Sequence, residues 1–156
     1  MNLLKLSDKP FNIRLIAIIS ALLNILIHLL VYNNLEYHRD ELLYFSLGMH
    51  PAFGYATVPP MIGWLAAVMQ WIFGTSLFAV KILPALLSGA FTLVAISITK
   101  ELGGRTYAVI LTGITLLVMP FALRSFYYFM PVAFDIFFWA LIMLFFLRYI
   151  NTGKDK

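Results

Sequence analysis

Cysteine is absent from this sequence, and charged residues are scarce. Of its 156 residues, 11 are Lys or Arg and 7 are Asp or Glu, whereas 62% are hydrophobic. The absence of cysteine excludes disulfide frameworks, thiol nucleophiles and thiolate metal sites. The scarcity of charge excludes soluble enzymes, nucleic-acid-binding modules and disordered tails, because a soluble chain of this size needs more charge to cover its surface. We therefore expect no nucleic-acid partner.

Hydrophobic and aromatic residues are abundant instead. The mean hydropathy is +0.91, and the chain has 14 Phe, 8 Tyr and 3 Trp. This composition is typical of a chain surrounded by lipid, so membrane lipids are the first expected partner. A helix needs roughly 20 apolar residues to cross the hydrocarbon core. Four uncharged runs fit one crossing each: 15–35, 82–99, 106–123 and 125–147, the last interrupted only by Asp135.

A fifth uncharged run, 42–80, is not one helix, because glycines and prolines interrupt residues 48–60. What remains is a short apolar segment at 61–73. It is too short for a crossing and suits a helix that lies in the membrane interface or packs on the bundle, with Trp64 and Trp71 as interfacial anchors.

The basic residues select one topology. With four crossings, eight of them lie on the cytoplasmic side and only Arg39, Lys81 and Arg124 lie outside; with 61–73 as a fifth crossing the split is five against six. We therefore expect an all-α integral plasma-membrane protein with about four transmembrane helices in a single domain, 1–156. Both termini are cytoplasmic, the first crossing is a retained signal anchor, and a long external loop at about 33–81 carries one or two short interfacial helices.

The start of this loop is the most polar part of the chain. If 37–48 is helical, Tyr37, Asp40, Glu41 and Tyr44 share one face. Two neighbouring carboxylates near a low-dielectric surface resist ionising together, so one of them could accept a proton near neutral pH. The alternative is that Asp40 or Asn34 caps the helix and Glu41 is solvated.

Other ionisable residues extend this candidate site. Asp135 is costly among apolar neighbours unless it faces a wet cavity or caps a helix after Pro131. His38 and His50 could join the carboxylates in a divalent metal site, although no metal-binding spacing supports this, and His28 is expected to be a buried polar residue. Arg39, Lys81 and Arg124 could bind a phosphate or extend to lipid headgroups. The candidate substrate-binding residues are Arg39, Tyr44, His50, Tyr55, Lys81 and Arg124.

The order of these signals resembles a known family. The segments are His38-Arg39-Asp40-Glu41-Leu42-Leu43-Tyr44, Gly48-Met49-His50, Gly54-Tyr55-Ala56-Thr57-Val58-Pro59-Pro60-Met61, Ser76 to Leu86, Lys100-Glu101-Leu102-Gly103-Gly104-Arg105, and Pro120 followed by Asp135. From about 36 to 152 the chain resembles the N-terminal portion of bacterial GT-C membrane glycosyltransferases, the relatives of protein O-mannosyltransferases and aminoarabinose transferases.

The resemblance implies an enzyme that moves a sugar from a polyprenyl-phosphate carrier to an acceptor at the external membrane face, with inversion. It implies Asp40 as the general base and Asp135 as a second acidic residue near the site. Glu41, the neighbour of Asp40, completes the three candidate catalytic residues. Val58 and Lys81 depart from the residues that many members have at these positions. Members also have more crossings, so a missing C-terminal region or a partner subunit is expected to complete the donor pocket.

Two alternatives stay open at this point. One is a small membrane protein that binds or moves a polyprenyl-phosphate lipid without transferring sugar, and the other is a small transporter with an acidic residue in the membrane. The sequence does not specify the sugar, the acceptor (protein, lipid or glycan) or the need for a metal cofactor.

Overall fold

The computed structural model describes residues 12–34 and 36–153, and these ranges are mostly helical and contain no strand. Asn12 begins the first helix by accepting a hydrogen bond from the Arg14 amide. The elements in chain order are α1 (Ile13–Val31), α2 (Arg39–Ser46), the 3₁₀ turn η1 (Leu47–Met49), α3 (Met61–Phe73), α4 (Leu77–Glu101), α5 (Thr106–Val118), α6 (Pro120–Ser125) and α7 (Pro131–Thr152).

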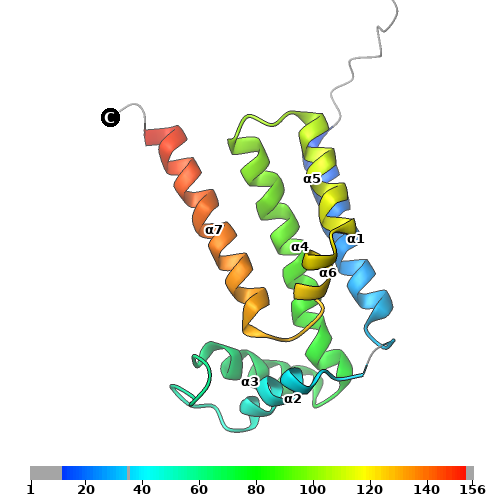
Figure 1. The fold of residues 1–156 in the computed structure, drawn as a ribbon, viewed down its shortest axis with the longest axis vertical. Helices are drawn as coiled ribbons and strands as arrows, with labels where there is room; N and C mark the ends of the chain where they lie inside the picture. Colours follow the sequence, from blue (N-terminus) through cyan, green and yellow to red (C-terminus); the bar gives the residue numbers. More distant parts are fainter. Residues whose placement is uncertain (1–11, 35, 154–156) are drawn as a thin grey trace, which may run out of the picture.

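Helix α4 is the centre of a bundle, where it packs against α1, α5 and α7 (Figure 1). The short helices α2 and α3 lie across one end of this bundle. The start of α1 and the end of α7 lie at the other end, as the expected topology requires. Among the described residues, α1, α4 and α7 are long and apolar enough to cross a membrane. The all-α membrane fold is therefore confirmed.

The expected crossing at 106–123 is not one continuous helix. Helix α5 ends at Val118, Met119 is extended, and α6 starts at Pro120. Proline has no backbone N–H and forces the preceding residue out of the helical region, so the helix breaks at this point. The third passage through the bundle is thus made by α5 and α6 together, and a loop at 126–130 leads into α7, which makes the fourth.

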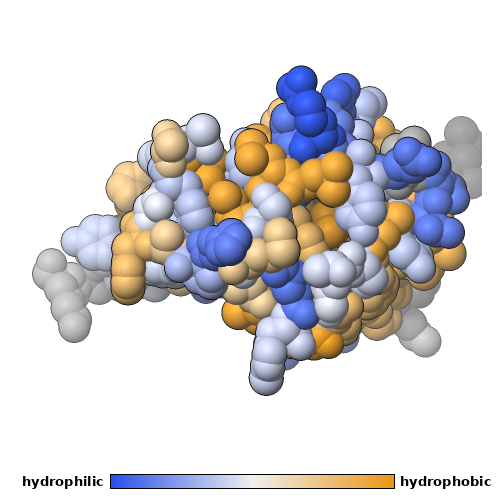
Figure 2. Space-filling model, turned by 90° about the horizontal axis from the view of Figure 1, so that it is seen from below, coloured by the Kyte–Doolittle hydropathy of each residue, from blue (hydrophilic) through white to orange (hydrophobic). Residues whose placement is uncertain are grey.

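The external loop differs from the expectation at its end. Helix α3 has the expected bounds, but α4 begins at Leu77, after Ser76 caps it by accepting a hydrogen bond from the Ala79 amide. Lys81 therefore lies inside α4 instead of at the loop boundary. Trp64 and Trp71 are exposed on α3, and their place at the membrane interface stays a prediction. Figure 2 shows this end of the molecule, where hydrophobic and hydrophilic residues are interspersed.

A polar seam runs between α1, α4 and α6. His28 is buried, with Nδ1 2.8 Å from the Asn24 carbonyl oxygen on its own helix and Nε2 3.2 Å from the Leu123 carbonyl oxygen on α6. The Ser88 hydroxyl of α4 lies 3.4 Å from Nδ1. The prediction that His28 is a buried polar residue bonded to a neighbouring helix is confirmed.

Gly48 fixes how closely α2 and η1 approach α3. A Cβ atom at Gly48 would lie 2.6 Å from the backbone nitrogen of Ala67 and 2.7 Å from the backbone carbon of Ala66, whereas a Cβ at Gly54 would meet nothing within 4 Å. We expect Gly48→Ala to lower the free energy of unfolding by about 1–3 kcal/mol, because backbone cannot move aside as a flexible side chain can. Gly54→Ala is the matched control, and equal effects of the two changes in reversible unfolding in micelles would contradict this packing argument.

Candidate functional site

The first turn of α2 is built by reciprocal capping. His38 Nδ1 accepts a hydrogen bond from the Asp40 amide at 3.3 Å, and Glu41 Oε2 accepts one from the His38 amide at 3.0 Å. This capping box satisfies two backbone donors and fixes the conformation of residues 38–41. The cap is His38, so the alternative in which Asp40 or Asn34 caps this helix is wrong.

Asp40 is the accessible carboxylate of the pair. Its side chain is 38% exposed, with Oδ1 3.3 Å from Arg39 Nε and Oδ2 3.9 Å from His38 Nδ1. Arg39 itself extends into solvent. Asp40 can therefore meet a molecule that approaches from outside, and Arg39 and His38 are its charged or polar neighbours.

Glu41 has the opposite environment. Its side chain has no exposed surface, and the Lys81 ammonium donates to both carboxylate oxygens at 2.7 Å. The Phe129 amide donates to Oε1 at 2.9 Å. The alternative in which Glu41 is solvated is wrong, because Lys81 compensates its charge inside the protein. The expected shared face of carboxylates and phenols is thus divided, with Asp40 outside and Glu41 inside.

Lys81 was expected to bind substrate, but only 2% of its side chain is exposed. Its ammonium lies 4.0 Å from the ring centre of Tyr127 and 4.9 Å from that of Tyr128. A lysine enclosed by a carboxylate and two aromatic faces does not reach a ligand at the surface. The structure therefore removes Lys81 from the substrate-binding surface.

Tyr127 and Tyr128 are site residues that the sequence analysis missed. The Tyr128 ring lies 5.0 Å from the His38 ring, and so connects the loop before α7 to the start of α2. The Tyr127 hydroxyl donates to the Val31 carbonyl at 3.2 Å. A signal was present in the sequence, because four consecutive aromatic residues, 126–129, follow Arg124 and Ser125, and clusters of aromatic residues near a basic residue are typical of a membrane interface.

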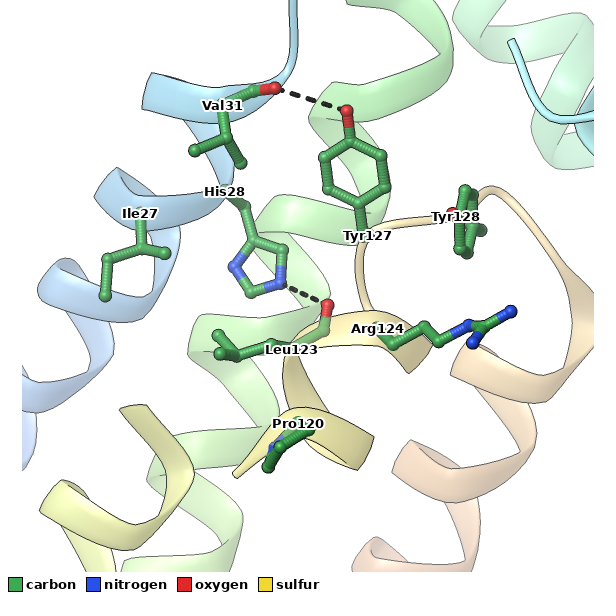
Figure 3. A pocket seen from close by; sticks show the side chains of 8 residues that line it. All are labelled: Ile27, His28, Val31, Pro120, Leu123, Arg124, Tyr127 and Tyr128. Carbon is green, nitrogen blue, oxygen red and sulfur yellow. Dashed lines mark hydrogen bonds between the residues drawn. The ribbon is translucent and has the colours of Figure 1, made fainter. Parts of the chain in front are cut away.

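Two apolar cavities meet at Arg124 and Tyr128. One, of about 360 Å³, lies between α1 and α6, and the other, of about 300 Å³, lies between α6 and α7. In Figure 3, the exposed Arg124 side chain points away from His28 toward α7. Both cavities have mostly apolar linings, which suit a hydrocarbon chain. Arg124 places a positive charge next to these linings.

Asp135 is exposed on α7, and within the described part of the chain it makes no hydrogen bond or ion pair. The N-cap of α7 is Met130, so the capping alternative for Asp135 is wrong. Val132 lines the cavity between α6 and α7. Residues three apart share a helix face, which places Asp135 one turn beyond that cavity. No contact joins Asp135 to Asp40 or Glu41.

Three other expected substrate-binding residues are less central. Tyr44 packs against the core cluster at this end of the bundle, and His50 is exposed in the loop after η1. The Tyr55 hydroxyl accepts from the Ala52 amide at 3.1 Å and faces the His50 carbonyl at 3.1 Å. It therefore stabilises the loop instead of facing the site.

The sequence was compared with family models after this geometry was established. Residues 57–156 match the model described as dolichyl-phosphate-mannose-protein mannosyltransferase. The chain belongs to this family. Searches of curated proteins and of solved structures gave no match.

Membership of the mannosyltransferase family identifies the chain as a membrane glycosyltransferase of GT-C type. The matched range contains α3 to α7, with Lys81, Arg124 and Asp135, and begins after α2. Asp40 lies outside the matched range of this mannosyltransferase-family chain. Its candidate role therefore rests on the geometry of α2 and on the contacts of α2 with the matched residues.

The possible divalent metal stays a prediction for this mannosyltransferase-family chain. The described residues contain no group of three or more His, Asp or Glu side chains that could hold an ion. His38 uses Nδ1 as an acceptor for the Asp40 amide, and His50 lies in the loop. We derive no chemical step through a metal.

Proposed function

We propose that this chain transfers a sugar from a polyprenyl-phosphate-linked donor to an acceptor at the external membrane face, with Asp40 as general base. The observation that carries the proposal is the accessible carboxylate of Asp40 next to His38, whose ring contacts a residue, Tyr128, that lines both cavities at Arg124. His38 and Tyr128 thus connect Asp40 to the two cavities. Membership in a glycosyltransferase family supports the same reaction class.

The transfer follows from the positions of these groups. Asp40 accepts the proton of the acceptor hydroxyl while the acceptor oxygen attacks the anomeric carbon of the sugar. The bond between that carbon and the phosphate oxygen breaks, and its electron pair leaves with the lipid phosphate. Attack opposite the leaving group inverts the anomeric centre. Arg124 stabilises the negative charge of the departing phosphate, and the apolar cavities hold adjacent hydrocarbon.

The role of Arg124 gives a specific prediction. We expect Arg124→Gln to raise the KM for the lipid-linked donor by roughly tenfold or more, because the glutamine loses the charged hydrogen bonds to phosphate. Arg148→Gln is the matched control, since Arg148 is also exposed but pairs with Glu101 at the other end of α4. The KM values are measured in membranes with a series of donor concentrations. Equal KM values in wild type and Arg124→Gln would exclude this role.

The external position of the site is also testable, because a chain without cysteine accepts a single reporter cysteine. Phe53 is 93% exposed at the α2–α3 end, and Thr152 is exposed at the end of α7. A membrane-impermeant maleimide should label Phe53→Cys in intact cells and Thr152→Cys only after permeabilisation. The reverse pattern would place the site inside the cell, and labelling of both in intact cells would contradict the arrangement of the helices.

The direct experiment is transfer from a radiolabelled polyprenyl-phosphate sugar in membranes that contain this chain. Transfer that depends on Asp40 supports the proposal, whichever acceptor class (protein, lipid or glycan) carries the label. Saturable donor binding without transfer in a correctly inserted chain would overturn it. That result would favour the alternative of a protein that binds or moves a polyprenyl-phosphate lipid.

A further inference from the structure

We propose that the buried Glu41–Lys81 ion pair is a positioning element that holds Asp40 in place for the transfer reaction. Neither residue contacts substrate in this proposal, which rests on the proposed function. The pair acts through the backbone of α2, because Glu41 is the residue next to Asp40. Glu41 was expected from the sequence to be catalytic, and in this proposal it is a positioning residue instead.

The hydrogen bonds of Glu41 fix it from three directions. Lys81 Nζ lies 2.7 Å from each carboxylate oxygen, the Phe129 amide lies 2.9 Å from Oε1, and the His38 amide lies 3.0 Å from Oε2. These donors come from α4, from the loop before α7 and from the start of α2. One carboxylate thus joins three segments that are distant in the sequence.

The aromatic side chains around Lys81 extend this junction to a fourth segment. The ammonium contacts the faces of Tyr127 and Tyr128, and the Tyr127 hydroxyl reaches the Val31 carbonyl at the end of α1. Tyr128 in turn contacts His38, the cap of α2. Movement of Lys81 would therefore be transmitted to the cavities at Arg124 as well as to Asp40.

Stability alone does not account for a buried pair of this kind. Apolar or neutral residues of similar volume often fold as stably, because a buried ion pair loses much hydration. The pair fixes the orientation of the Glu41 carboxylate, since a charged donor holds both of its oxygens at short distances. The Asp40 amide bonds to His38, whose amide bonds to Glu41, so a displacement of Glu41 moves Asp40 directly. A catalytic group displaced by 1 Å can lose roughly a hundredfold in rate.

A double-mutant cycle tests the positioning role. The variant Glu41→Gln/Lys81→Met removes both charges and so leaves no unpaired buried charge. We expect it to lower kcat for sugar transfer by roughly tenfold or more while the donor KM changes less than about twofold. In the Asp40→Asn background the same double change should lower the residual rate by less than about twofold, because there is no base left to position. Equal losses in both backgrounds would overturn the proposal.

A second measurement does not depend on activity. A spin label at Leu43→Cys reports on α2, and one at Ile72→Cys on α3 serves as control, because both side chains are about half exposed. Neutralising the pair should increase the mobility of the Leu43 label and leave the Ile72 label unchanged. If α2 loosens but wild type shows no transfer, the proposed function fails while the pair still holds α2. If the Leu43 spectrum does not change, the positioning proposal fails whatever the transfer assay shows.

Discussion

Asp40→Asn should lower sugar transfer by about two to four orders of magnitude, which is the usual contribution of a general base. Asparagine has nearly the same shape as aspartate but cannot accept the acceptor proton at neutral pH. The helix keeps its N-cap, because the cap is His38 and its contact is with the Asp40 backbone amide. The variant should therefore insert and accumulate as wild type does.

The matched control for this change is Glu36→Gln, which neutralises an exposed acid four residues earlier in the same external segment. It should transfer sugar at the wild-type rate. Initial rates are compared at saturating donor, after equal amounts of inserted protein are confirmed by immunoblotting. Normal turnover in Asp40→Asn would show that another group accepts the proton, and Asp135 would be tested next because it is an exposed acid one turn beyond the cavity between α6 and α7.

Lys81→Met should be among the most destabilising single substitutions in this chain. It leaves the Glu41 carboxylate buried with only the backbone amides of His38 and Phe129 as donors. Removing one partner of a buried ion pair typically costs about 3–5 kcal/mol, because the remaining charge is uncompensated. We expect this loss in the free energy of unfolding, measured by reversible unfolding in lipid micelles.

Two further variants distinguish the stability lost with the ion pair from the stability lost with the packing of the Lys81 side chain. Adding Glu41→Gln to Lys81→Met should restore most of the stability, since no charge remains in the core. Arg148→Met breaks the exposed pair with Glu101 and should leave the unfolding curve unchanged, because water and salt already screen that pair. If the two single variants lose equal stability, the burial of the Glu41–Lys81 pair is not what makes it sensitive.

Local signals in the sequence were sufficient for part of the fold. Helix α3 has the expected bounds because Pro60 precedes it and Gly74, with a positive φ of 68°, follows it. The break before α6 was missed although Pro120 is visible, because the run 106–123 was bounded by its charges alone, whereas glycines and prolines were used to divide the run 42–80. A run can be uncharged throughout and still contain a break, because proline lacks the backbone N–H that a helix needs.

The site was harder to predict because its decisive contacts are not local. Asp40 and Arg124 were named from their residue types, and the structure leaves both accessible at one end of the bundle. The pairing of Glu41 with Lys81 joins residues 40 positions apart, and its contact with Phe129 spans 88 positions. A pattern of neighbouring acids cannot show which one is buried, since that depends on where α4 and the loop before α7 pack.

The break at Met119 shortens the uninterrupted helix in one of the four passages through the bundle. Helix α5 has 13 residues and at about 1.5 Å per residue spans roughly 20 Å, whereas the 25 residues of α4 exceed the roughly 30 Å of a typical hydrocarbon core. Val118, Met119 and Phe121 are exposed near this break. Helix α5 alone is therefore too short to cross, and α6 supplies the rest of this passage. Arg124 lies on α6, beyond the break, so a charged residue follows the break instead of interrupting a continuous membrane-spanning helix.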